Sequence, residues 1–161
     1  AGNTQLTSHQ AHRGGVVAKD APKTGQHQVE EALTREALGL FFDEPDRCST
    51  TNTSGGVNNV VSYVQTPQGD KYILRIYNNG NVSAKVVFEH TVLSQLAQQK
   101  LSFQVPRALL SKSGNMHELL SSGAECCVFE IIPGELAKTT SPEEVGRATG
   151  ELNTAMGKVS V

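Results

Sequence analysis

Long apolar runs are missing from this sequence. No stretch approaches eighteen consecutive apolar residues, the length that a bilayer-spanning helix requires. Tryptophan is absent, aromatic residues make up 5% of the chain, and the hydrophobic fraction of 37% is below that of a typical compact domain. Because 161 residues suffice for one domain of ordinary size, we expect part of the chain to lie outside the packed core.

A strong excess of one charge is also missing. The chain has 14 Lys and Arg residues against 16 Asp and Glu residues, so its formal net charge is -2. Such a balance creates no field that would attract nucleic acid or an anionic membrane. We therefore predict that neither is a partner of this protein.

Cysteine is scarce, with three residues in the chain. The count is odd, and Cys126 and Cys127 are adjacent, which suits neither a disulfide framework nor a zinc site. In the strand predicted there, one thiol should face the core and the other a cleft or solvent. The cysteines are therefore expected to be reduced, which is typical of an intracellular protein, and we predict a cytoplasmic location.

The first 27 residues lack the composition of a folded segment. They contain no aromatic residue and one short apolar pair, so burial cannot offset the entropy of ordering them. We predict a disordered tail over residues 1–27. The tail has neither an initiating Met nor a long apolar segment, which argues against a secretory signal and predicts that the natural chain is longer. Asp20 is its sole acid, which leaves organellar import as an alternative.

Residues 28–77 predict a helix followed by a β-hairpin. Apolar residues at helical spacing predict a helix within residues 28–42, with Gly39 as its stop. Residues 43–54 are polar and typical of turns. Strands are predicted over 60–65 and from residue 71 onwards, joined by a turn rich in Pro and Gly.

The second strand of this hairpin has two different faces. Its side chains alternate, so that one face carries Tyr72, Leu74 and Ile76 and the other carries Ile73, Arg75 and Tyr77. A helix should then run from Ser83, as its N-cap, to about Gln99. Its inward stripe consists of Val86, Glu89, Leu93, Leu96 and Ala97. Glu89 is the odd member because it is charged.

The rest of the sheet is predicted from its turns. Pro106 precedes an extended segment, and turns at "KSGN" (112–115) and "SSG" (121–123) separate it from two further strands. The last strand is closed by Pro133 and Gly134. These elements give an α+β fold with an antiparallel sheet of about five strands and one inserted helix.

The final helix carries the clearest local signal. Ser141 as N-cap, Pro142 at the first position and Glu144 at the third form a capping box. An apolar stripe follows, made of Val145, Ala148, Leu152, Ala155, Met156 and Val159. Because an uncovered stripe of this length is costly in water, we expect the natural chain to continue and cover it.

Polar and glycine residues between the predicted elements suggest an anion site. Gly55 and Gly56 let backbone amides approach an anion without clashes of Cβ atoms, and Asn58 tolerates unusual dihedral angles. The guanidinium of Arg75 on a neighbouring strand is suited to phosphate oxygens. Glu89 would orient that cation by pairing with it. This order predicts the nucleotide-holding half of a phosphotransferase.

The sequence resembles the aminoglycoside phosphotransferase-like kinases, which include choline, homoserine and hydroxylysine kinases. The similarity spans about residues 29–157, with six motifs in the family's order. These are "SGGVNN" (54–59), "YILRIY" (72–77), "FEHTVLSQL" (88–96), "FQVPRAL" (103–109), "VFEIIPGE" (128–135) and "VGRATGELNTAM" (145–156).

The resemblance implies a protein-kinase-like N-terminal lobe over 28–134, with the hinge exit and first helix of the second lobe over 135–161. It implies a phosphate-covering loop, a strand cation with its helix partner, and a hinge whose backbone binds adenine. The corresponding cofactor-binding residues are Ser54, Gly55, Gly56, Val57, Asn58 and Asn59, then Arg75 and Glu89, then Phe129, Glu130, Ile131 and Ile132.

The cofactors implied are ATP and Mg²⁺, and the partners are a nucleotide and a small-molecule acceptor. Two departures from the family pattern matter. Most relatives have Lys at the position of Arg75. The catalytic motif "HGDxxxxN" and a later metal-binding Asp are missing from residues 1–161, so we expect neither a catalytic base nor a metal ligand here, and no activity of this segment alone.

Each feature also has a plainer interpretation. The Gly-Gly and Asn-Asn pairs are more often a hairpin turn than a phosphate loop, and Arg75 on a strand is usually solvated. His90 and His117 are expected to be surface or structural residues, with no partner that the sequence identifies. The alternative function is therefore a non-catalytic α+β interaction module, which would not bind nucleotide.

Overall fold

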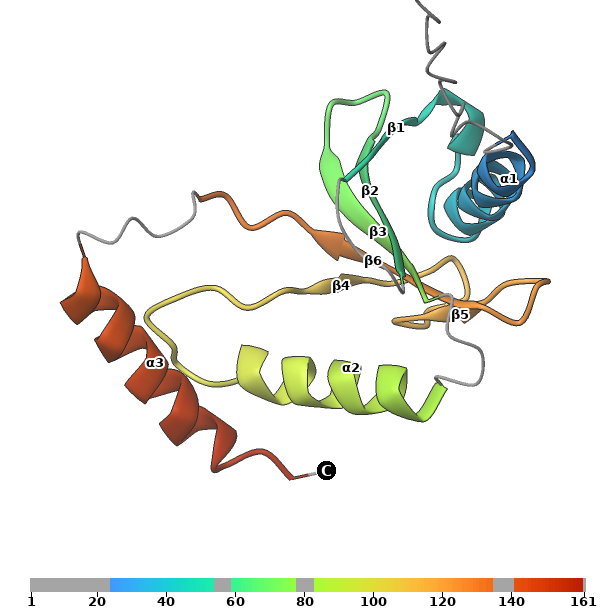
Figure 1. Ribbon diagram of the computed structural model, residues 1–161. Coiled ribbons are helices and arrows are strands. Elements are labelled where there is room, and N and C mark those ends of the chain that lie inside the picture. Colours follow the sequence, from blue (N-terminus) through green and yellow to red (C-terminus); the bar gives the residue numbers. More distant parts are fainter. Residues whose placement is uncertain (1–23, 54–58, 78–82, 135–140, 161) are drawn as a thin grey trace, which may run out of the picture.

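The computed structural model describes residues 24–53, 59–77, 83–134 and 141–160. Three α-helices, one 3-10 helix and six strands are formed by these parts of the chain (Figure 1). They are α1 (Thr24–Phe41), η1 (Pro45–Arg47), β1 (Ser49–Asn52), β2 (Asn59–Gln65), β3 (Lys71–Tyr77), α2 (Ser83–Ala97), β4 (Ala108–Leu109), β5 (Glu118–Leu119), β6 (Glu125–Glu130) and α3 (Pro142–Met156).

The strands form one antiparallel sheet. Its order is β1-β2-β3-β6-β4, and the short β5 pairs directly with the first residues of β6. Six strands thus replace the five predicted, because residues 49–52 are a strand within the segment 43–54 that we interpreted as turns. All four residues of β1 are exposed, so no apolar alternation marked it, and pairing with β2 creates it.

The predicted hairpin is confirmed as β2 and β3. Its register pairs Val61 with Arg75 and Asn59 with Tyr77. Gly69 adopts φ of 95° in the connecting turn, a value that favours glycine. The predicted turns at 112–115 and 121–123 are also present, each with a glycine at positive φ.

The sheet lies between α1 on one face and α2 on the other (Figure 1). On the α1 face, the apolar core is made by Ala37, Leu38, Phe41, Val64, Leu74, Ile76, Leu120, Cys126 and Val128. The α2 face has a smaller cluster of Tyr77, Val86, Cys127 and Phe129. The strand alternation predicted for residues 72–77 is therefore confirmed, with the odd-numbered residues toward α2.

Helix α1 corrects two predictions. It begins at Thr24, so its first turn lies within the predicted tail of residues 1–27, while residues 1–23 are outside the described part. It also continues through Gly39, where we predicted a stop, and the Phe42 N–H still donates to Leu38 O at 2.8 Å. The reason is tertiary, because extending the helix buries Phe41 against the sheet.

Helix α2 keeps most of its predicted stripe. Val86 and Leu96 are buried and Glu89 is partly buried, but the third buried residue is His90, which the predicted stripe omitted. The helix ends at Ala97 rather than at residue 99. The Ser83 hydroxyl, predicted as a cap, donates a hydrogen bond to Glu125 instead.

Helix α3 lies beside the C-terminal end of α2 (Figure 1). The prediction that Pro142 begins this helix is confirmed. The predicted capping box is wrong in one respect, because the Ser141 side chain makes no capping hydrogen bond. The Gln99 side chain donates to Ala155 O at 3.0 Å, and Ala155 is buried. Leu152 and Met156 remain exposed. None of the helices described is long and apolar enough to cross a bilayer.

Candidate functional site

Arg75 and Glu89 meet on the α2 face of the sheet. Arg75 lies in the middle of β3, opposite Val61 of β2 and Cys127 of β6, so its backbone is held on both sides. Its Nη1 atom is 2.8 Å from Glu89 Oε1, which confirms the predicted pairing. The two side chains are 32% and 33% exposed. A pair so accessible to water adds little stability, but a ligand can reach it.

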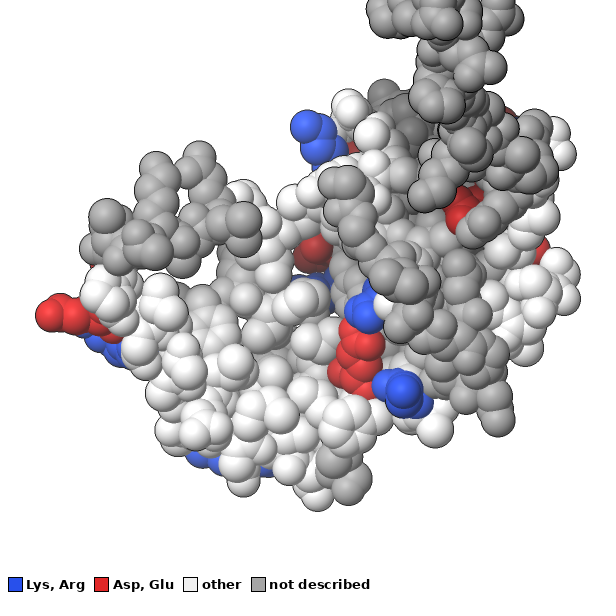
Figure 2. Space-filling view, in the orientation of Figure 1, with Lys and Arg blue, Asp and Glu red and all other residues white. Residues whose placement is uncertain are grey.

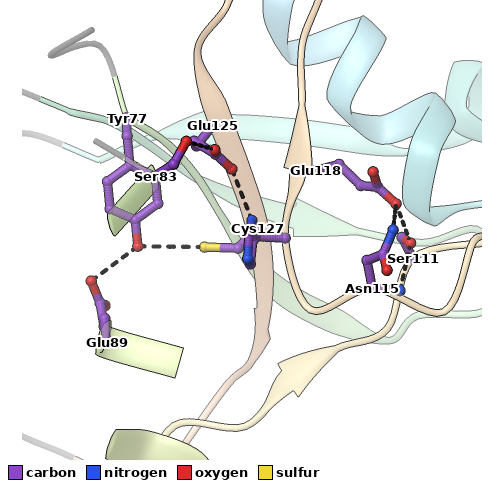
Figure 3. A network of polar contacts seen from close by, with 9 residues as sticks. Tyr77, Ser83, Glu89, Ser111, Asn115, Glu118, Glu125 and Cys127 are labelled. Carbon is purple, nitrogen blue, oxygen red and sulfur yellow. Dashed lines mark hydrogen bonds and ion pairs between the residues drawn. The ribbon is translucent and has the colours of Figure 1, made fainter. Parts of the chain in front are cut away.

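Tyr77 contacts both residues of this ion pair. It follows Arg75 by two residues on the same strand face, and its ring lies 4.6 Å from the guanidinium carbon. Its hydroxyl donates to Glu89 Oε2 at 3.1 Å, and accepts from the Cys127 thiol, 3.7 Å away (Figure 3). Strand alternation correctly predicted the face on which Tyr77 lies, but no role was predicted for this residue. Its spacing from Arg75 was the available signal.

The adjacent cysteines face opposite sides of β6. Cys126 belongs to the α1-side core and Cys127 to the α2-side cluster, and both are fully buried. The prediction that one would face a cleft or solvent is therefore wrong, because helices cover both faces at this strand. Burial is the main cause that raises the pKa of each thiol to about 12. All three cysteines are free.

A second polar cluster fixes the start of α2. Glu125, 5% exposed at the beginning of β6, accepts a hydrogen bond from Ser83 through Oε1. Its other oxygen lies 2.8 Å from His117 Nδ1, which supplies the partner that the sequence did not identify for this histidine. The helix that carries Glu89 is thus anchored to the sheet at its first residue.

His90 has a structural environment, as expected. It is 3% exposed and stacks on Phe129, with ring centroids 5.5 Å apart and an interplanar angle of 8°. Its Nε2 atom has no hydrogen-bond partner among the residues described. Burial, followed by the nearby His117, lowers the pKa of His90, so its ring is neutral near pH 7.

The predicted hinge leaves the sheet at the end of β6. The side chain of Phe129 is buried, and the Glu130 N–H donates to Arg107 O at 2.9 Å, so it is not available to adenine. Ile131 and Ile132 lie beyond the strand ladder. With Glu130 they line a cavity of about 430 Å³, whose other walls include Leu96, Phe103 and Val105. Arg75 and Glu89 do not line this cavity.

The predicted phosphate loop falls largely outside the described residues, which exclude Ser54, Gly55, Gly56, Val57 and Asn58. Its two flanks are described. Thr53 donates from its N–H to Val61 O at 2.9 Å, and Asn59 begins β2 opposite Tyr77. The loop therefore connects the end of β1 to the start of β2, and its last residue, Asn59, pairs with Tyr77 on the strand that carries Arg75.

Charges of both signs occur on the face of the molecule shown in Figure 2. Lys and Arg atoms lie beside Asp and Glu atoms near its middle, and wide areas elsewhere on this face are uncharged. Within the described residues, no group of three or more His, Cys, Asp or Glu side chains is arranged to hold a metal ion. The chemistry available at the site is that of a partly exposed guanidinium paired with a carboxylate, a group suited to anions.

Comparisons with known proteins place this arrangement in context. None of the curated protein sequences matches the chain. Among solved structures, it is similar to amicoumacin kinase hAmiN in complex with AMP-PNP, Ca²⁺ and Ami, with a TM-score of 0.61 and 19% identity over 85% of this chain and 41% of that one. It is also similar to a microcompartment-associated aminopropanol kinase, with a TM-score of 0.62 and 18% identity over 78% and 40% of the two chains.

These likenesses show a kinase-like fold, as predicted. The chain spans about two-fifths of the length of each of these kinases. The pattern of one family, described as the phosphotransferase enzyme family (APH), matches residues 49–160, which include the sheet, α2 and α3. The chain therefore belongs to the APH phosphotransferase family.

Proposed function

We propose that this chain is the nucleotide-binding part of an ATP-dependent kinase that phosphorylates a hydroxyl group of a small molecule. The observation that carries the proposal is the Arg75–Glu89 ion pair, at 2.8 Å. Arg75 lies two residues from Tyr77, which pairs with Asn59 at the end of the predicted phosphate loop of residues 54–59, called the glycine loop below. In this proposal residues 28–134 are the nucleotide-binding lobe, and residues 135–161 begin the second lobe.

Each group has a distinct task in binding ATP. The planar guanidinium of Arg75 binds phosphate oxygens, and Glu89 keeps it aimed at them. The amides of residues 54–59 cover the phosphates. Adenine is bound by the backbone that follows Phe129, where Ile131 and Ile132 supply the N–H donors because that of Glu130 is already used.

The residues present fit a nucleotide better than they fit a metal ion. A cation that is one-third exposed and held by a carboxylate is suited to an anionic phosphate. The described residues provide no metal-binding cluster, so any Mg²⁺ bound with ATP would take its protein ligands from elsewhere. Bound ATP supplies the phosphoryl group, and the metal neutralises its charge.

The acceptor class is proposed from the family. Metabolites or aminoglycoside-like compounds with a hydroxyl and an amine group are suggested by the two similar structures, an amicoumacin kinase and an aminopropanol kinase. The described residues include no group that we assign as catalytic base. We therefore expect residues 1–161 alone to bind ATP weakly and to release no phosphate above background.

A titration with ATP and Mg²⁺ tests this function. We expect the amide NMR signals of Gly55, Gly56, Ile131 and Ile132 to shift, and Arg75→Ala to weaken ATP binding by about 10- to 100-fold, because a charge-assisted hydrogen bond is lost. Arg47→Ala is the matched control, because Arg47 of η1 is also an exposed arginine paired with a carboxylate, that of Glu44. Unchanged signals at millimolar ATP would favour the interaction module.

A further inference from the structure

Tyr77 contacts both members of the ion pair. Its ring lies 4.6 Å from the Arg75 guanidinium carbon, and its hydroxyl donates to Glu89 Oε2 at 3.1 Å. Glu89 Oε1 is bound by Arg75. The two carboxylate oxygens are thus held by two different donors, which prevents the carboxylate from rotating about its terminal bond.

The tyrosine is a rigid support, whereas the pair it contacts is not. Tyr77 is 6% exposed and belongs to the buried cluster with Val86, Cys127 and Phe129. Arg75 and Glu89 are long side chains, each about one-third exposed, which lose considerable rotamer entropy when fixed. A buried ring attached to the sheet restricts both at once, so that the cation is already oriented before a ligand arrives.

The hydroxyl is suited to donate at physiological pH. Burial is the main cause that raises the pKa of Tyr77, followed by the neighbouring Cys127. The phenol therefore stays protonated, and its proton is directed to Glu89 while its oxygen accepts from the Cys127 thiol (Figure 3).

We propose that Tyr77 is a positioning residue, which holds the Arg75–Glu89 pair in the orientation that binds the phosphates of the nucleotide. This inference rests on the proposed function for its ligand, although the restraint itself exists without nucleotide. Tyr77 does not contact ATP in this proposal. It acts through Arg75, and it also faces Asn59 across the β2–β3 pair, at one end of the glycine loop.

The restraint is tested first without nucleotide. The rate of rotation about the Arg75 Nε–Cζ bond, measured by NMR on the unmodified protein, should be several-fold slower than that of exposed Arg35. Tyr77→Phe, which keeps the ring and removes the hydroxyl, should make it several-fold faster. Tyr72→Phe is the matched control, since Tyr72 lies on the same strand but packs on Phe42 on the α1 face. Equal rates for Arg75 and Arg35 in the unmodified protein would overturn the proposal.

The consequence for the ligand is tested with ATP and Mg²⁺. Tyr77→Phe should weaken ATP binding by about three- to tenfold, the loss expected for one hydrogen bond to a charged group that is partly exposed. In an Arg75→Ala background the same change should have no further effect, because Tyr77 acts through Arg75. An equal loss in both backgrounds contradicts the positioning role.

The two proposals fail in different ways. If Arg75→Ala leaves ATP binding unchanged, the proposed function is wrong, and the rotation rates still decide whether Tyr77 restrains Arg75. If Arg75→Ala abolishes binding but Tyr77→Phe changes neither affinity nor rotation, only the role of Tyr77 is wrong. Cys127→Ala separates general loosening of the cluster from this role, because it preserves the Tyr77–Glu89 bond and should leave the rotation of Arg75 slow.

Discussion

The two faces of the sheet differ in character, because the α1 face is apolar and the α2 face carries polar contacts. Toward α1, the central strands present Leu74, Ile76 and Val128, all fully buried in an apolar core. Toward α2, the alternate positions of β3 present Ile73, Arg75 and Tyr77, and the polar contacts gather there. Because neighbouring residues of a strand point to opposite faces, the apolar core and the residues proposed to bind nucleotide alternate along β3.

This separation explains how a partly exposed charge is held accurately. An ion pair that water reaches cannot organise its own surroundings, since its net contribution is small. The α1 face supplies the apolar burial that keeps β3 and β6 in place. The other face can then carry polar and charged side chains such as Glu125, His90 and Arg75.

The largest effect on stability should come from Leu74, and it should clearly exceed that of its neighbour Arg75. Leu74→Ala removes a fully buried side chain from the α1-side core and should lower the free energy of unfolding by about 3 kcal/mol. Arg75→Ala removes one member of a screened pair and should cost about 1 kcal/mol or less. Urea denaturation of both variants measures the difference.

Similar losses of stability in the two variants would contradict this difference between the two faces of the sheet. Leu109→Ala is a further control, since this partly buried residue packs at the margin of the same core and should cost less than Leu74→Ala.

A smaller, pH-dependent effect is expected at His90. Its pKa is lowered by burial, so between pH 6.5 and its folded value the unfolded chain binds a proton that the folded chain does not. This part of the stability is present above pH 6.5 and is lost as the pH falls. His90→Phe preserves the stacking on Phe129 and removes the titration, so its gain over the unmodified protein should grow from pH 8 to pH 5.

Thermal unfolding at several pH values measures this gain. His27→Phe serves as control, because His27 is an exposed residue of α1. A stability difference for His90→Phe that stays constant between pH 8 and pH 5 would mean that His90 does not titrate differently in the folded chain.

The smallest effect is expected from thiol reagents on the folded protein. The thiolate is the reactive form, and burial raises the pKa of Cys126 and Cys127 to about 12. Iodoacetamide at pH 8 should modify the half-buried Cys48 first and the other two only after unfolding, as mass spectrometry can follow. Faster reaction of Cys127 than of Cys126 would show that the α2 face opens more readily than the α1 face.

Local patterns sufficed for much of this architecture. Alternation predicted the β2–β3 hairpin and the faces of its second strand, and glycine-containing turns predicted the later strands. Helical spacing brought Glu89 to the inward side of α2, and the spacing of Arg75 and Glu89 predicted their pairing. These features depend on periodicity, which a sequence displays directly.

Features that depend on contacts between distant segments were not predictable in this way. The extension of α1 beyond Gly39 depends on packing of Phe41, and β1 depends on pairing with β2. Likewise, the Tyr77–Glu89 bond and the Ser83–Glu125 bond join residues 12 and 42 positions apart. No local pattern specifies which hydroxyl will meet which carboxylate.

The edges of the sheet have a consequence for association with other chains. Edge strands offer unpaired backbone groups to which a foreign strand can add, and long apolar edges promote aggregation. Here β1 has four residues, all polar and exposed, while β4 and β5 have two residues each. An incoming strand would find few backbone partners at these borders, although Leu119 of β5 is an exposed apolar side chain. The shortness of the edge strands thus limits growth of the sheet from one molecule into the next.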